Sequence, residues 1–160
     1  MVATFEVEFA AVAEAVDALG GVERACRATL APAIVELCRR RVAMLLGNEA
    51  ELDRAPTTDA AGDLGGKLAA LARWTSSPLF GPAERACLAF TEQFVIDVTQ
   101  IDDTTVAAVA AHSSPGDTYV FARWVQACEA RQRVELLFRH DPRLAALSAS
   151  AGAAATSGNR

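Results

Sequence analysis

The sequence predicts an all-α fold, and its composition and its apolar spacing carry that prediction. Alanine occupies 35 of the 160 positions, whereas aromatic residues make up only 6% of the chain. Strands are rich in β-branched and aromatic residues, and alanine is the strongest helix former. Apolar residues also recur at three- and four-residue spacing over several long segments. Length and apolar content suit one domain over residues 1–147, and the low-complexity stretch 148–160 is expected to be a loose tail.

The first expected helix covers residues 5–19, because Phe9, Val12, Val16 and Leu19 follow helical spacing. Gly20 and Gly21 are expected to end it, since glycine is a poor helix former. A second helix over 21–29 is expected to end before Pro32.

The third helix is expected to run from Pro32 to Leu46, because proline suits the first turn of a helix. Gly47 is a typical C-terminal stop, and Asn48 is a typical N-cap for the next helix. Pro56 must end that short helix, since proline cannot continue one.

Turn residues dominate Pro56–Gly66, which predicts a loop, and helical spacing returns over 67–74. After a turn at Ser77–Pro78, Pro82 starts a long helix that reaches about Val98. Three further elements complete the expected order: a helix over 104–111 capped by Asp102 or Asp103, a turn over 112–117, and a last helix over 118–138.

Charge and targeting signals exclude several classes of function. The formal charge is −5, and the densest basic run is Arg39–Arg41, so no nucleic-acid partner is expected. No apolar stretch approaches the length of a membrane span, and the N-terminus carries acids where a secretory signal carries basic residues. These features predict a cytoplasmic protein with no membrane partner.

The four cysteines are expected to be small core residues. Their positions leave no C-x-x-C pair and no zinc pattern, so neither a metal nor a cofactor is expected. The cysteines are Cys26, Cys38, Cys87 and Cys128.

Two segments resemble a known family. Residues 74–92 read W-T-S-S-P-L-F-G-P-A-E-R-A-C-L-A-F-T-E, and residues 36–47 read E-L-C-R-R-R-V-A-M-L-L-G. Both are similar to segments of the carboxymuconolactone decarboxylase and alkylhydroperoxidase D family, and residues 127–133 give a weaker match. The resemblance spans roughly residues 15–142. It implies an all-α fold of six to eight helices and a homo-oligomer, a trimer or a multiple of it.

The chain departs from that family at the redox centre. Peroxidase members carry C-x-x-C directly after the glycine that matches Gly47, and a histidine four residues further on. Here these positions hold Asn48, Glu51 and Ala55. Peroxide reduction needs a thiolate of lowered pKa and a second sulfur, which asparagine and glutamate cannot supply.

Asn48 and Glu51 allow two interpretations. Asn-x-x-Glu at a helix start is a capping-box signal, in which Asn48 accepts from the amide of residue 51 and Glu51 reaches back. Alternatively, Glu51 faces Glu36 across a pocket, and the two carboxylates act as a general acid and base. For Glu36, the competing interpretation is an ion pair with Arg39 or Arg40.

Three more residues are candidates for a pocket. Gln132 interrupts the apolar line of the last helix, so it is either a buried hydrogen-bonding group or a pocket wall, and Arg131 lies beside it. Arg41 shares an apolar face of its helix. It either pairs with a buried carboxylate, for which Glu36 is one choice, or extends its charge to solvent.

The sequence therefore favours a non-redox, oligomeric protein that binds a small molecule or a partner. The alternative is a cysteine-independent enzyme of decarboxylase, lactone or isomerase type that uses Glu36 and Glu51. Hydroperoxide reduction rests on the family resemblance alone.

Overall fold

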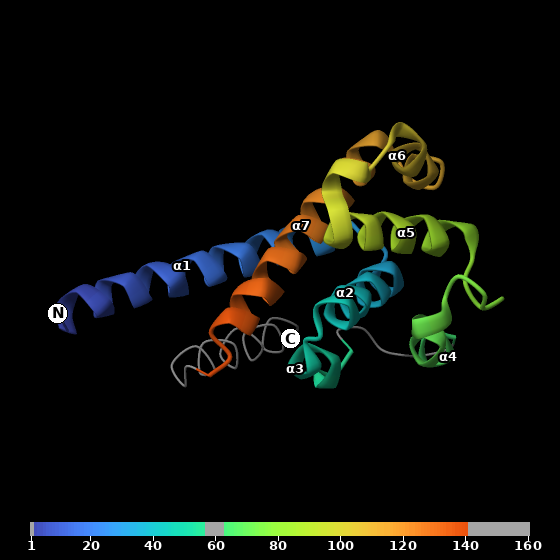
Figure 1. Ribbon diagram of the computed structural model, residues 1–160. Coiled ribbons are helices and arrows are strands. Elements are labelled where there is room, and N and C mark those ends of the chain that lie inside the picture. Colours follow the sequence, from blue (N-terminus) through green and yellow to red (C-terminus); the bar gives the residue numbers. More distant parts are fainter. Residues whose placement is uncertain (1, 57–62, 141–160) are drawn as a thin grey trace, which may run out of the picture.

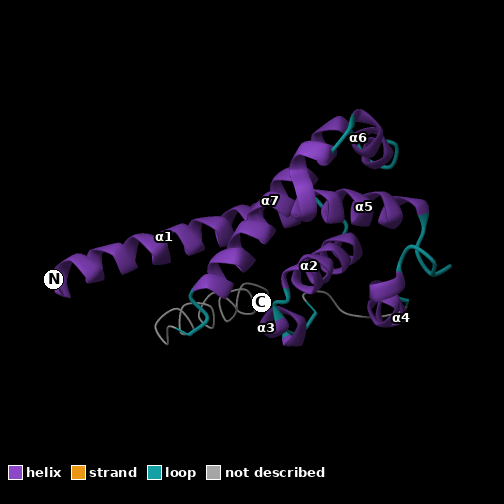
Figure 2. Cartoon of the chain, in the orientation of Figure 1, coloured by secondary structure: helices purple, strands orange, loops and turns teal. Residues whose placement is uncertain are grey.

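The computed structural model describes the backbone of residues 2–56 and 63–140, and the side chains from residue 10 onward. This part of the chain folds into seven α-helices and two short 3₁₀ helices, and it holds no strand (Figure 2). The expected all-α fold is confirmed. The expected tail over 148–160 and the middle of the expected loop, residues 57–62, lie outside the described residues.

One continuous helix, α1 (Val2–Arg27), replaces the two that the sequence predicts. The expected break at Gly20–Gly21 is wrong. Two glycines weaken a helix by about 1 kcal/mol each relative to alanine, but α1 packs along α7 and is joined to it directly after the glycines by the ion pair between Glu23 and Arg131. Tertiary contact therefore outweighs local propensity here.

The region from α2 (Pro32–Leu46) to α3 (Glu49–Asp53) follows the sequence prediction. Pro32 opens α2, and Gly47 ends it in the left-handed conformation with φ 67°. Its backbone amide caps the carbonyls of Ala43 and Met44. The side chain of Asn48 then caps α3 by accepting a hydrogen bond from the amide of Glu51.

The next helix, α4 (Leu64–Ala70), begins three residues before the predicted start at 67, inside the expected loop. Leu64 is buried in the core, and its burial favours a helical turn that contains Gly65 and Gly66. A 3₁₀ turn, η1 (Leu71–Arg73), follows α4. The long helix α5 (Pro82–Asp97) begins at Pro82 as predicted.

After the 3₁₀ turn η2 (Val98–Gln100), Asp102 caps the helix α6 (Asp103–Ala110), as one of the two predicted caps. The last helix, α7 (Pro115–Leu137), begins three residues earlier than expected. Pro115 occupies its first turn instead of a loop, because Ser114 and Asp117 form a capping box around that turn.

The core lies around α2, which packs against α5, α7 and α3 (Figure 1). Its apolar centre includes the fully buried Val35, Leu37, Cys38, Leu71, Leu88, Trp124 and Val125. The N-terminal half of α1 extends beyond this bundle. No helix in the described residues combines the length and the apolar character needed to cross a membrane.

Candidate functional site

The polar site lies where α2, α3 and α7 meet, with α1 packed on its other side. Five charged side chains there are less than a tenth exposed, which is rare for charged residues unless they are paired. They are Glu23, Glu36, Arg39, Glu51 and Arg131. Together with the less buried Arg40, Arg54 and Glu135, they form what we call the ion-pair network.

Arg39 joins the two carboxylates that the sequence singles out. Its Nη2 atom lies 2.7 Å from Oε1 of Glu36, and its Nη1 atom lies 2.7 Å from Oε1 of Glu51. Nε of Arg39 donates a further hydrogen bond to Glu36, and Nη1 also donates to the backbone carbonyl of Glu51. Glu36 and Glu51 therefore share one guanidinium instead of facing each other across an open pocket.

Arg131 is the second centre of the network. Its guanidinium pairs with Glu23 of α1, with Glu51 of α3 at 3.2 Å and with Glu135 one turn further along α7 at 2.8 Å. Burial alone lowers the pKa of this guanidinium, but the carboxylates of Glu23 and Glu51 raise it by more. Arg131 therefore stays charged and links three helices.

Electrostatics keeps Glu51 ionised as well. Burial alone raises the pKa of its carboxyl group, but the charges of Arg131, Arg39 and Arg54 outweigh that effect and hold the pKa below its usual value. Glu36 is fully buried and accepts hydrogen bonds from both Arg39 and Arg40. The geometry therefore favours the ion-pair interpretation of Glu36.

Asn48 and Gln132 complete the buried polar layer. Oδ1 of Asn48 accepts from the amide of Glu51 at 3.3 Å, as a cap should. The reciprocal half of the expected capping box is wrong, because the amide of Asn48 donates to Ala43 and the Glu51 carboxylate contacts the arginines. Gln132 is fully buried and donates to the carbonyl of Arg39 at 3.2 Å, in agreement with the hydrogen-bonding interpretation.

Arg41 lies apart from this site. Its Nε atom is 2.5 Å from a carboxylate oxygen of Glu92 on α5, which also accepts a hydrogen bond from the indole of Trp74. The choice of Glu36 as its partner is therefore wrong. Along α2, Arg41 follows Arg39 and Arg40 and points to the α5 side, where Glu92 is within reach.

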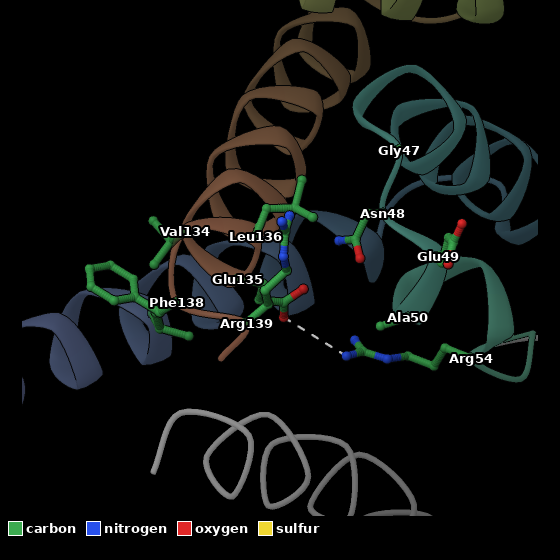
Figure 3. Close-up of a pocket in the computed structure, with 11 residues that line it drawn as sticks. Gly47, Asn48, Glu49, Ala50, Arg54, Val134, Glu135, Leu136, Phe138 and Arg139 are labelled. Atoms are coloured by element: carbon green, nitrogen blue, oxygen red, sulfur yellow. Dashed lines mark ion pairs between the residues drawn. The ribbon is translucent and has the colours of Figure 1, made fainter. Parts of the chain in front are cut away.

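An open cleft of ≈ 620 Å³ adjoins the network, between the start of α3 and the end of α7 (Figure 3). Residues of α7 line one side and residues 47–54 line the other, and the ion pair between Arg54 and Glu135 joins the two sides (Figure 3). Asn48, Arg54 and Glu135 belong to both the cleft and the polar layer, whereas Glu36 and Glu51 lie behind it. The lining residues are Val16, Gly47, Asn48, Glu49, Ala50, Arg54, Val134, Glu135, Leu136, Phe138 and Arg139.

Three members of the network were not among the candidates from sequence. Glu23 continues the spacing of Val16 and Leu19 on α1, so a glutamate on an apolar face was the available signal. Glu135 follows Arg131 by four residues, which is the spacing of a helical ion pair. Arg54 follows Glu51 by three residues, which is also a helical ion-pair spacing.

The thiols are not activated for redox chemistry. Cys38, Cys87 and Cys128 are buried, and Cys26 is half-buried. Burial, with a smaller effect from Cys87, raises the pKa of Cys38 well above its usual value, and burial with Glu84 raises the pKa of Cys87 to about 11. Reactive cysteines need the opposite shift.

We therefore expect the folded protein to be almost inert toward thiol reagents. Ellman's reagent should label Cys26 at most, and should label all four thiols in 6 M guanidinium chloride. Hydroperoxide consumption with dithiothreitol should not exceed the rate without protein. Turnover that disappears in Cys38→Ser would contradict this prediction.

Comparison with known proteins adds no assignment. No protein-family model matches the chain, and no curated protein matches it significantly. In the part of the chain that the structure describes, no group of histidine, cysteine, aspartate and glutamate side chains is arranged to hold a metal ion.

Proposed function

We propose that this chain is a carboxymuconolactone decarboxylase-like and alkylhydroperoxidase D-like protein that has lost redox chemistry and binds a small molecule in the cleft between α3 and α7. The main support for this proposal is the cleft itself. It opens beside Asn48, at the position of the missing cysteine pair, and it is large enough for a small metabolite.

The lining favours an amphipathic ligand. Val16, Val134 and Phe138 offer an apolar wall. On the opposite side, Arg54 pairs with Glu51 and Glu135 but is 40% exposed, so its guanidinium offers hydrogen-bond donors to a ligand. Such a cleft suits a molecule that has an apolar body and one polar group.

Acid–base catalysis by Glu36 and Glu51 has weaker support. Each carboxylate is buried and bound by arginine, and the lowered pKa of Glu51 leaves it no proton to donate near neutral pH. Neither residue lines the cleft. Their proposed role is to fix α2, α3 and α7 in the geometry that keeps the cleft open.

The proposed protein acts in the cytoplasm as a homo-oligomer, a trimer or a multiple of it. The family resemblance supports this assembly. Apolar side chains on the surface support it too, because large exposed apolar groups on a small domain often mark contacts.

Filling the cleft tests the proposed function. We expect some members of a panel of aromatic and medium-chain carboxylates, amines and lactones to raise the melting temperature of the wild-type protein. Ala50→Trp should abolish those shifts, because Ala50 is exposed and lines the cleft. Ala72→Trp, at an exposed position on η1 outside the cleft, should keep them. No shift with the wild type, or shifts that persist in Ala50→Trp, would refute the proposal.

A further inference from the structure

A second depression, at the other end of the molecule, is almost entirely apolar. This groove of ≈ 480 Å³ lies where α5 and η2 meet α6 and the first turns of α7. Large apolar groups stand exposed in and beside it, with Tyr119 and Ile96 each 68% exposed. The lining residues are Phe90, Phe94, Val98, Ile101, Val106, Pro115, Thr118, Tyr119 and Ala122. We call this surface the acidic groove, because its apolar lining is flanked by the aspartates described below.

The segment that builds the groove carries only negative formal charge. Residues 86–122 contain five acidic residues and no lysine or arginine, so this stretch alone matches the −5 of the whole chain. Asp97, Asp102 and Asp117 each follow or precede a lining residue directly. Asp97 and Asp102 are the N-caps of η2 and α6, and Asp117 pairs with Ser114 in the capping box of α7. A fitting occupant is therefore apolar and basic.

The chain itself carries such a surface at the far end of α7. Leu137 is 76% exposed and Phe138 is 38% exposed, and Arg133 and Arg139 flank them at exposed positions. Residues 123–140 contain four arginines and two glutamates. Arg131 is bound in the ion-pair network, and Arg133 pairs with Glu129 and donates to the carbonyl of Val95 in its own copy. Arg139 therefore supplies the exposed positive charge at this end, opposite in sign to the groove. We call Leu137, Phe138 and Arg139 the basic end of α7.

We propose that the basic end of α7 in one copy of this chain docks into the acidic groove of another copy. Within one copy the basic end does not fill the groove, because none of its residues lines the groove and Leu137 follows the last lining residue, Ala122, by fifteen positions, about 22 Å along the helix. Figure 1 shows α7 running from beside α6 toward the region of α3. The contact therefore joins two different surfaces, and each copy offers one of each.

This inference supplies an interface for the proposed homo-oligomer and does not depend on any ligand of the cleft. The groove and the cleft share no lining residue. Phe138 and Arg139 of the basic end also line the cleft, but the tested positions do not overlap, because Ala50 lines the cleft and neither Tyr119 nor Leu137 does. Failure of the ligand experiment and failure of this proposal are therefore separate results.

Two charge-introducing variants test the docking. Tyr119→Asp disables the groove, and Leu137→Asp disables the basic end. Both positions are mostly exposed, so the fold should tolerate both changes, which circular dichroism and thermal melting will verify. In sedimentation velocity at 10 to 100 µM, the wild type should be oligomeric and each variant should be monomeric. Gln126→Asp, at an exposed position midway along α7, should keep the wild-type size.

Mixing the two folded variants in equal amounts gives the decisive measurement. Tyr119→Asp retains its basic end and Leu137→Asp retains its groove, so the mixture should form a one-to-one heterodimer through a single intact contact. Each variant at the same total concentration, without the other, should remain monomeric. A monomeric wild type, variants of wild-type size, or a mixture that stays monomeric would each overturn the proposal.

Discussion

Replacing Arg131 with methionine should lower the free energy of unfolding by about 3–5 kcal/mol, the usual cost of removing one partner from a buried ion pair. Methionine keeps most of the apolar stem but leaves Glu23, Glu51 and Glu135 without the guanidinium that they share. Because Glu23 and Glu51 are almost completely buried, water cannot replace the lost cation. Urea unfolding at pH 7, followed by circular dichroism, measures the loss.

Two further variants show whether the loss of stability is specific to the ion-pair network. Arg123→Met removes an exposed arginine from the same helix, where it donates to Gln126, and should change stability by less than about 0.5 kcal/mol. Arg131→Lys keeps the charge but loses the branched geometry, so its loss should be intermediate. If Arg131→Met fails to fold, the stability of Arg131→Lys can still be compared with that of the wild type and of Arg123→Met. A loss in Arg131→Met no larger than that in Arg123→Met would show that the network contributes little.

The fold was predictable where local signals determine it. Pro32 and Pro82 open helices, Gly47 closes one in the left-handed conformation, and each works within a single turn of chain. The incorrect helix boundaries lie where tertiary packing determines the structure. Gly20–Gly21 does not break α1, because α1 packs along α7 and is tied to it by the Glu23–Arg131 ion pair. The start of α4 depends on the burial of Leu64.

The candidate site shows the same division. The pairs that Glu36 makes with Arg39 and Arg40 follow from three- and four-residue spacing on one helix. The contacts of Arg131 with Glu51 and Glu23 join residues 80 and 108 positions apart, so only the tertiary fold reveals them. Hence the sequence marked several members of the site but left open whether two carboxylates or a guanidinium occupy its centre.

The arrangement also explains how the fold accommodates several charged groups in its interior. Four carboxylates and four guanidinium groups balance in charge within the ion-pair network, and Asn48 and Gln132 satisfy polar atoms that face it. Buried ion pairs of this kind add little net stability relative to apolar residues, yet they cost much when one partner is removed. The network therefore fixes the relative positions of α1, α2, α3 and α7 more than it strengthens the core.

Glu51→Gln provides the second large effect and separates a helix cap from an ionic centre. If the side chain of Glu51 served only the capping box, glutamine would fit the box and stability would change little. In the structure, its carboxylate contacts Arg39, Arg131 and Arg54. Glutamine cannot neutralise the two buried guanidinium groups among them, so we expect a loss of about 3 kcal/mol or more at pH 7.

The pH dependence of stability gives the same answer independently. Because the folded protein holds the pKa of Glu51 below its unfolded value of about 4.3, the stabilisation from this group is fully present above that pH. It is lost as the pH falls through the lower, folded pKa. The wild type should therefore lose its advantage over Glu51→Gln between about pH 5 and the acid limit of folding, so that the two stability curves converge.

Urea unfolding of both proteins between pH 7 and pH 3 tests this convergence. Asp53→Asn removes an exposed carboxylate from the same short helix, and its curve should stay within about 0.5 kcal/mol of the wild type throughout. Parallel curves for the wild type and Glu51→Gln would mean that the carboxylate has no depressed pKa, and a negligible loss at pH 7 would return Glu51 to the role of a simple cap. Converging curves with a large loss at neutral pH would instead assign Glu51 to the centre of the network, because only a group ionised by its arginine neighbours gives both results.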